Sequence, residues 1–115
     1  QPLIASQSNI EPETYQRMLM RRRQNRPRGL ANSLLGFGAG AMPDLWNELP
    51  HLQMPVLLAS GSHDIKYSVL ARKMHFCIPG AQRTQILGAG HAALYEKPKR
   101  FCTWMREIME WPVCA

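Results

Sequence analysis

The stretch that decides the fold reads Thr84-Gln85-Ile86-Leu87-Gly88-Ala89-Gly90-His91. A short apolar run ends in glycines, and a histidine follows on the turn. A second unit of this kind lies upstream, where the apolar run 56–60 ends at Gly61 and Asp64 follows. Continuous apolar runs of this length are typical of strands buried on both faces of a parallel sheet. Because the carboxyl ends of such strands hold ligands at one edge of the sheet, we expect Asp64 and His91 to form a candidate catalytic pair.

The segments around these two strands complete an α/β pattern. Residues 67–76 carry apolar side chains at helical spacing, residues 82–87 form the second strand, and a final helix begins near residue 98. Strand, helix, strand and helix in this order predict a right-handed βαβ unit with a covering helix. Upstream, we expect a loop at residues 1–10 and two helices at 12–23 and 30–37, with a break between them at 25–29. A short helical turn is expected at 43–49.

The length, composition and first residues of the chain limit the kind of protein it can be. The 115 residues suffice for one domain, 45% of them are hydrophobic, and no apolar run reaches the length of a membrane span. The three cysteines have no metal-type spacing, so we interpret them as reduced thiols of a cytosolic protein. The chain opens on Gln1 without a signal-like leader, which is typical of a fragment or a processed product.

The net charge of +6 is concentrated in one basic run that contains Arg21, Arg22, Arg23, Arg26 and Arg28. By itself such a run favours a solvated helix face. Nucleic-acid binding is disfavoured, because no aromatic residue is interleaved with the arginines and no nucleic-acid-binding motif occurs. A third interpretation is that one or two of these guanidinium groups bind an anionic substrate, since their planar geometry suits carboxylates.

Asp64 and His91 have the residue types and the order of a proton relay. A carboxylate that accepts a hydrogen bond from one imidazole nitrogen sets the tautomer and stabilises the charged ring. Asp64 precedes His91 with one helix between them, as in the order serine, acid, histidine of α/β-hydrolases. The nucleophile is missing, because the chain contains no Gly-x-Ser-x-Gly, and its serines at 60, 62 and 68 lie near the acid. Asp64 also suits a helix N-cap, and Glu96 is more typical of a cap or an ion pair than of an acid–base group.

Two motifs carry a resemblance to a known superfamily. Gly61-Ser62-His63-Asp64-Ile65-Lys66-Tyr67 resembles the acid loop of α/β-hydrolases, and residues 88–98, with Gly-Ala-Gly-His and then Glu-x-Pro, resemble their histidine loop. The runs 29–34, 36–40 and 43–46 narrow the resemblance to the 2-succinyl-6-hydroxy-2,4-cyclohexadiene-1-carboxylate synthases of menaquinone and phylloquinone biosynthesis. Residues 1–6 are similar to the cap segment of that family. The resemblance covers the C-terminal half of a family member.

The resemblance implies a fold, an activity and a set of site residues. Residues 1–50 would be part of the helical cap and its return segment, and residues 51–115 the C-terminal βαβα part of the core, with the last two parallel strands. The family implies a lyase without cofactor or metal that eliminates pyruvate from an anionic enolpyruvyl precursor. Asp64 and His91 match its acid and histidine, and Arg22 is the best match to its cap arginine, with Arg21 and Arg23 as alternatives.

The resemblance also implies partners. The serine, the oxyanion-hole loop and most of the sheet would lie in an N-terminal half of the fold, so we expect the chain alone to be inactive. The anionic substrate is the other expected partner, and neither nucleic acid nor membrane is expected. Two alternatives stay open. One is another member of the superfamily, such as an esterase or a carbon–carbon bond hydrolase, and the other is a non-catalytic fragment that binds a partner through an unpaired strand edge and its basic helix.

Overall fold

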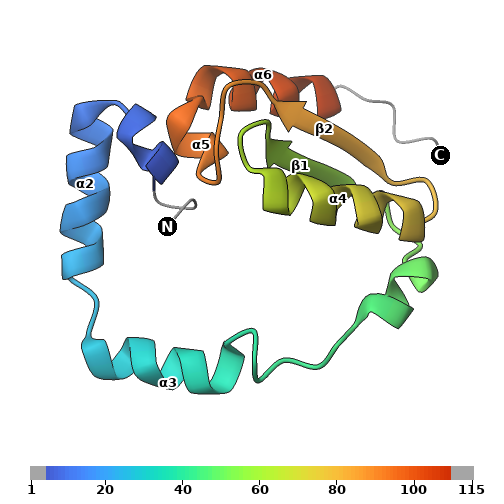
Figure 1. Ribbon diagram of the computed structural model, residues 1–115, viewed down its shortest axis with the longest axis horizontal. Coiled ribbons are helices and arrows are strands. Elements are labelled where there is room, and N and C mark those ends of the chain that lie inside the picture. The colour runs from blue at the N-terminus through green and yellow to red at the C-terminus, as the bar shows by residue number, and fades with distance from the viewer. Residues whose placement is uncertain (1–4, 110–115) are drawn as a thin grey trace.

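The computed structural model describes residues 5–109 (Figure 1). Short helical segments and longer helices precede a single strand–helix–strand unit, and two more helices follow it. In chain order the elements are η1 (Ser6–Asn9), α2 (Pro12–Arg23), α3 (Pro27–Phe37), η2 (Trp46–His51), β1 (Leu57–Gly61), α4 (Ile65–Cys77), β2 (Gln82–Ile86), α5 (Ala93–Glu96) and α6 (Pro98–Met109).

The two strands form a parallel pair. Their register aligns Leu57 with Gln82 at one end and Gly61 with Ile86 at the other. The crossover helix α4 lies along one side of the pair, and α6 lies along the other side (Figure 1). The predicted α/β class and the order strand, helix, strand, helix are therefore confirmed.

The first strand is less buried than its apolar sequence predicted. Ser60 and Gly61 are buried, but Leu57 and Leu58 are only half-buried and Ala59 is exposed. The reason is that β1 and β2 are the only strands among residues 5–109, so each has one open edge and the sheet faces are incompletely covered. The expectation of a strand buried on both faces is therefore wrong for this chain by itself.

Helix starts follow from local chemistry. The carboxylate of Asp64 accepts a hydrogen bond from the backbone N–H of Tyr67 at 3.2 Å and so caps α4, as expected. The helix predicted to begin at residue 30 begins one turn earlier, at Pro27 of α3. A proline is tolerated there because the first N–H groups of a helix have no partner within it. The break before α3 is therefore shorter than predicted. The expected N-terminal loop also contains the short helix η1.

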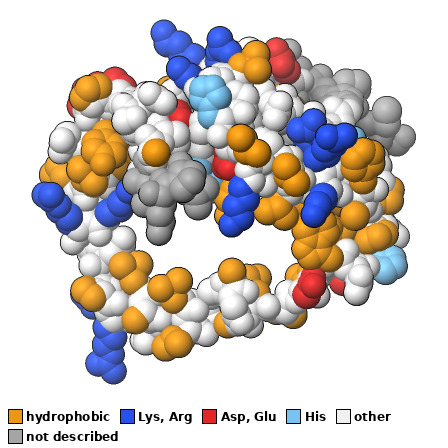
Figure 2. Space-filling model, in the orientation of Figure 1, with side chains coloured by type: hydrophobic (Ala, Val, Ile, Leu, Met, Phe, Trp, Pro, Cys, Tyr) orange, Lys and Arg blue, Asp and Glu red, His pale blue; other side chains and the backbone are white. Residues whose placement is uncertain are grey.

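The segment from η1 to η2 forms an arch beside the core (Figure 1). η1 lies next to α5, η2 lies next to α4, and α2 and α3 span the distance between them. Figure 2 shows open space between α3 and the strand–helix unit. On α3, Leu34, Leu35 and Phe37 are 72%, 78% and 80% exposed, so the apolar side chains of this helix have no cover among residues 5–109.

The dimensions agree with an open arrangement. The radius of gyration is 16.6 Å, whereas a compact domain of this length has about 13 Å. The core is small, and its buried apolar side chains are Ile10, Ala71, Ile78, Ala81, Ile86 and Ala89. Among residues 5–109, no helix is both long and apolar enough to cross a membrane. The division into a cap at residues 1–50 and a core at residues 51–115 stays a prediction.

Candidate active site

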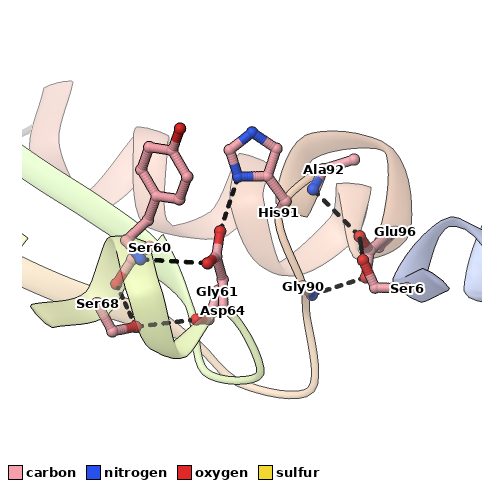
Figure 3. Close-up of polar contacts among 10 residues, drawn as sticks. Ser6, Ser60, Gly61, Asp64, Ser68, Gly90, His91, Ala92 and Glu96 are labelled. Atoms are coloured by element: carbon pink, nitrogen blue, oxygen red, sulfur yellow. Dashed lines mark hydrogen bonds and ion pairs between the residues drawn. The ribbon is translucent and has the colours of Figure 1, made fainter. Parts of the chain in front are cut away.

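The structure brings Asp64 and His91 together at the carboxyl ends of the two strands (Figure 3). Oδ2 of Asp64 lies 2.7 Å from Nδ1 of His91. The Asp64 side chain is buried, at 6% exposure, whereas 40% of the His91 side chain is exposed. The pair therefore has a buried carboxylate behind an accessible imidazole.

Backbone contacts between the two loops hold this pair in register. The N–H of Ser62 donates to the carbonyl of Ile86 at 3.1 Å, and the N–H of His63 donates to the carbonyl of Ala89 at 2.9 Å. In the other direction, the N–H of Gly88 donates to Oγ of Ser62 at 2.9 Å. The acid loop and the histidine loop thus form one hydrogen-bonded unit.

Two glycines permit the close approach of these loops. Gly88 has a φ of 73°, a left-handed conformation that favours glycine. At Gly61, a Cβ atom would overlap the backbone oxygens of Ala89 and Gly90. The glycines that signalled the ends of the strands are therefore the residues that let the two loops touch.

The ring of Tyr67 packs against the imidazole. The two ring centroids lie 4.5 Å apart with an angle of 46° between the planes. Because the backbone N–H of Tyr67 also donates to Asp64, this residue contacts both members of the pair. Tyr67 is the last residue of the acid-loop motif, and the structure gives it this contact with His91.

The arrangement fixes which nitrogen of His91 can act as a base. An ionised carboxylate only accepts hydrogen bonds, so the proton of the neutral imidazole lies on Nδ1, facing Asp64. The lone pair of Nε2 then remains free, and Nε2 has no hydrogen-bond partner among residues 5–109. When Nε2 takes up a proton, the buried carboxylate stabilises the positive ring.

The three serines near the acid have structural roles. Oγ of Ser68 donates to the carbonyl of Gly61 at 3.1 Å and lies 3.1 Å from Oγ of Ser60, while Ser62 accepts from Gly88. None of them forms a hydrogen bond with His91 in the described part of the chain. That the nucleophile lies outside this chain stays a prediction.

The structure assigns Glu96 a place that the sequence did not indicate. Its carboxylate is buried, at 5% exposure, and it accepts hydrogen bonds from the backbone of the histidine loop and from Ser6 (Figure 3). We predicted a cap or an ion pair near the last helix. The available signal was the position of Glu96 five residues after His91, but the contact with η1 spans ninety positions of the chain and no local pattern reveals it.

The arginine predicted to bind substrate lies on α2. Nη1 of Arg22 donates to Oε1 of Gln7, in η1, at 3.3 Å. Arg21 and Arg23 are exposed beside it. No hydrogen bond or ion pair joins these arginines to Asp64 or His91 in the described part of the chain, so a role in substrate binding stays a prediction.

No group of three or more His, Cys, Asp or Glu side chains within residues 5–109 could hold a metal ion. The chemistry of the pair itself needs a carboxylate and an imidazole only. The expectation of a reaction without cofactor stays a prediction.

No protein-family model matches the chain. Two curated relatives match it. This chain is 34% identical over 108 residues to the putative 2-succinyl-6-hydroxy-2,4-cyclohexadiene-1-carboxylate synthase of Bacillus subtilis. It is 26% identical over 106 residues to the 2-succinyl-6-hydroxy-2,4-cyclohexadiene-1-carboxylate synthase of Pectobacterium atrosepticum. The match covers 94% and 92% of this chain, but the chain spans only 39% and 40% of the length of these relatives.

Two solved structures are also similar to this chain. The structure of MenH from S. aureus superposes with a TM-score of 0.92 at 29% identity and covers 96% of this chain and 41% of its own. Est816, described as an N-acyl homoserine lactone degrading enzyme, superposes with a TM-score of 0.53 at 25% identity over 76% of this chain. In sequence and in fold, the chain therefore resembles the C-terminal part of proteins named as 2-succinyl-6-hydroxy-2,4-cyclohexadiene-1-carboxylate synthases, and its fold is part of the α/β-hydrolase fold.

Proposed function

We propose that this chain supplies the acid and the histidine of a lyase of menaquinone or phylloquinone biosynthesis. The reaction eliminates pyruvate from 2-succinyl-5-enolpyruvyl-6-hydroxy-3-cyclohexene-1-carboxylate and gives 2-succinyl-6-hydroxy-2,4-cyclohexadiene-1-carboxylate. The observation that carries the proposal is the 2.7 Å contact between Asp64 and His91, in a chain whose relatives are named for this synthase.

The geometry suits a proton relay. Nε2 of His91 takes the proton of a serine that belongs to the N-terminal half of the fold, and the serine oxygen removes a proton from the substrate ring. The new double bond forms as the carbon–oxygen bond to the enolpyruvyl group breaks, and the imidazolium returns its proton to the leaving group, which departs as pyruvate. Asp64 stabilises the positive ring of His91 between these two transfers.

The substrate carries carboxylates, for which Arg22 is the proposed partner. Its guanidinium is exposed on α2, and one of its N–H groups is held by Gln7, whose side chain is buried. This contact restrains the arginine while leaving other N–H donors free for a carboxylate. Arg21 and Arg23 remain the alternatives at this position.

The N-terminal half of the fold is the second proposed partner. The open edge of β1, the exposed apolar side chains of α3 and the large radius of gyration all support a missing neighbour. Joined to that half, the chain would gain a nucleophile and a covered sheet. We expect the chain alone to release no pyruvate from the substrate, and turnover by the isolated chain would contradict this.

We also propose a cytoplasmic location. The thiols of Cys77 and Cys102 are free, and free thiols persist in a reducing compartment. Cys114 lies outside the described residues. Thiol labelling of the protein inside intact cells tests the proposal, because an oxidised state of Cys77 or Cys102 there would contradict it.

The test of the proposed function uses the complete enzyme, in which the N-terminal half is joined to this chain, and follows pyruvate release. His91→Ala removes the relay, and we expect kcat to fall by more than about 10³-fold. The matched control is His63→Ala, because His63 is exposed in the neighbouring acid loop and its hydrogen bond to the histidine loop is made by the backbone N–H, which alanine keeps. Activity of His91→Ala close to that of the control would refute the proposal.

A second candidate function is ester or lactone hydrolysis. The observation that favours it is the fold shared with Est816. The same pair would then activate a serine that forms an acyl-enzyme. Incubation of the complete enzyme with p-nitrophenyl esters and an N-acyl homoserine lactone separates the two, since a burst of product from these substrates and no pyruvate release would favour the hydrolase.

A further inference from the structure

The carboxylate of Glu96 is the centre of a buried polar cluster behind His91 (Figure 3). Oε2 accepts the backbone N–H of Gly90 at 2.7 Å, and Oε1 accepts the backbone N–H of Ala92 at 3.1 Å. Oε1 also accepts the hydroxyl of Ser6 at 2.9 Å. A carboxylate buried to this degree needs such donors, and here all three come from two segments at the site.

Two of the three donors flank the histidine. Gly90 and Ala92 are the residues directly before and after His91, so the N–H groups that Glu96 accepts belong to the peptide before Gly90 and the peptide after His91. The backbone that carries His91 is thereby restrained on both sides, and from this backbone Nδ1 of His91 reaches Oδ2 of Asp64 at 2.7 Å.

The third donor comes from the arch. Ser6 belongs to η1, which lies against the histidine loop so closely that a Cβ atom at Gly90 would overlap Ser6. The next residue, Gln7, is buried and accepts a hydrogen bond from Arg22 of α2. Two consecutive residues of η1 thus form hydrogen bonds in two directions, Ser6 with Glu96 and Gln7 with Arg22 of α2.

We propose that Glu96 is a positioning residue for His91. Through the hydrogen bond between Glu96 and Ser6, the orientation of the His91 side chain toward Asp64 depends on the position of η1 against the histidine loop. The inference rests on the proposed catalytic role of His91. It adds a link between the first segment of the arch and the proton relay. When η1 is displaced, Glu96 loses a donor, and the loop that carries His91 loses its support.

The experiment uses the complete enzyme with Glu96→Gln and Ser6→Ala. The amide of glutamine has one acceptor oxygen, so it cannot accept from Gly90 and Ala92 as the carboxylate does. We expect Glu96→Gln to lower kcat on the order of 10²-fold with little change in KM, as a misplaced catalytic group does, and Ser6→Ala to lower it about tenfold. The controls are Glu107→Gln, exposed on α6, and Ser8→Ala, which loses only the local bond to Ala5.

A spectroscopic measurement separates positioning from general stability. The ¹⁵N chemical shift of Nδ1 in His91 reports its hydrogen bond to Asp64. We expect this signal to change in Glu96→Gln and Ser6→Ala and to stay constant in both controls. Unchanged signals together with unchanged kcat in both variants would overturn the inference, whereas an active His91→Ala enzyme would instead overturn the proposed function.

Two substitutions, made singly and together, test the contact between η1 and the histidine loop directly. Gly90→Ala brings a methyl group against Ser6, and we expect kcat to fall on the order of 10²-fold. Ser6→Gly removes the two side-chain atoms that this methyl group would overlap, and the third of the three nearest atoms, Oε1 of Glu96, lies at 3.1 Å. The double variant should therefore recover to within about tenfold of Ser6→Gly alone. A double variant as inactive as Gly90→Ala would contradict the proposed contact.

Discussion

The buried carboxylate of Asp64 contacts His91 with one oxygen and caps helix α4 with the other. Oδ2 lies 2.7 Å from Nδ1 of His91, and Oδ1 accepts the backbone N–H of Tyr67 at 3.2 Å. In the proposed function the first bond serves the proton relay, whereas the second caps α4. A substitution that keeps the second and changes the first can therefore separate the two roles.

Asp64→Asn is that substitution. Asparagine is a good N-cap, so α4 keeps its start and we expect the free energy of unfolding to change by less than about 1 kcal/mol. Its amide N–H₂ turned toward His91 would require Nδ1 to accept, which puts the ring proton on Nε2, the wrong tautomer for a base. We expect kcat for pyruvate release by the complete enzyme to fall about 10⁴-fold.

The matched control for this prediction is Asp44→Asn. Asp44 makes a similar local bond, from the N–H of Trp46 at 2.9 Å, and lies far along the chain from the site. Its variant should keep the activity of the unmodified enzyme. If Asp64→Asn retained activity within tenfold of that control, the tautomer argument would be wrong.

The packing of Tyr67 on the imidazole gives a second prediction. Tyr67→Ala removes a ring whose centroid lies 4.5 Å from that of His91. Freed on one side, the imidazole gains rotamers that face away from the substrate, and we expect kcat to fall about tenfold. Tyr67→Phe keeps the ring and should restore most of this loss. Equal losses in both variants, measured by steady-state kinetics, would show that the hydroxyl and not the ring matters.

The approach of the two loops at Gly61 gives a third prediction. A methyl group there would overlap the backbone oxygens of Ala89 and Gly90, and backbone cannot move aside as a flexible side chain can. We expect Gly61→Ala to lower the free energy of unfolding by about 1–3 kcal/mol, measured by urea denaturation. The control is Gly36→Ala in α3, where a Cβ atom would have open space. This variant should raise the free energy of unfolding by about 0.5–1 kcal/mol. A neutral Gly61→Ala would contradict the close approach.

The part of this architecture that is local in sequence could be predicted. Apolar runs that end in glycine marked both strands, and their shared direction placed Asp64 and His91 at one edge. The bounds of α2 at residues 12–23 agree with the structure, because Pro12 and the cap at Glu11 mark its start. Local propensity and the order of elements were sufficient for these features.

Features that depend on contacts distant in the sequence were not predicted. The bond between Ser6 and Glu96 joins residues ninety positions apart, and neither residue has a pattern that requires the other. The exposure of Ala59 also follows from what lies beside the sheet, which the apolar run itself does not specify. Periodicity indicates which side chains can be buried, whereas the neighbours decide which ones are.

The N-terminus of α2 gives the last prediction, which concerns pH. The carboxylate of Glu11 accepts the backbone N–H groups of Glu13 at 3.0 Å and Thr14 at 2.9 Å. These bonds, with that of Glu13 the larger cause, hold the pKa of Glu11 below its ordinary value. A lowered pKa in the folded state means that the cap stabilises α2 fully above the ordinary glutamate pKa of about 4.3 and that this contribution is lost as the pH falls through the lowered value.

The amide proton shifts of Glu13 and Thr14, followed by NMR from pH 6 downward, should therefore move together with a midpoint below about 4.3. Glu11→Gln removes the titrating group, so this common movement should disappear. Glu13→Gln is the matched control, because Glu13 is an exposed acid of the same turn that pairs with Arg17 at 3.8 Å and leaves the cap intact. A midpoint at or above the ordinary value, or a common movement that persists in Glu11→Gln, would show that another group titrates, since only the charged Glu11 carboxylate accepts from both amides.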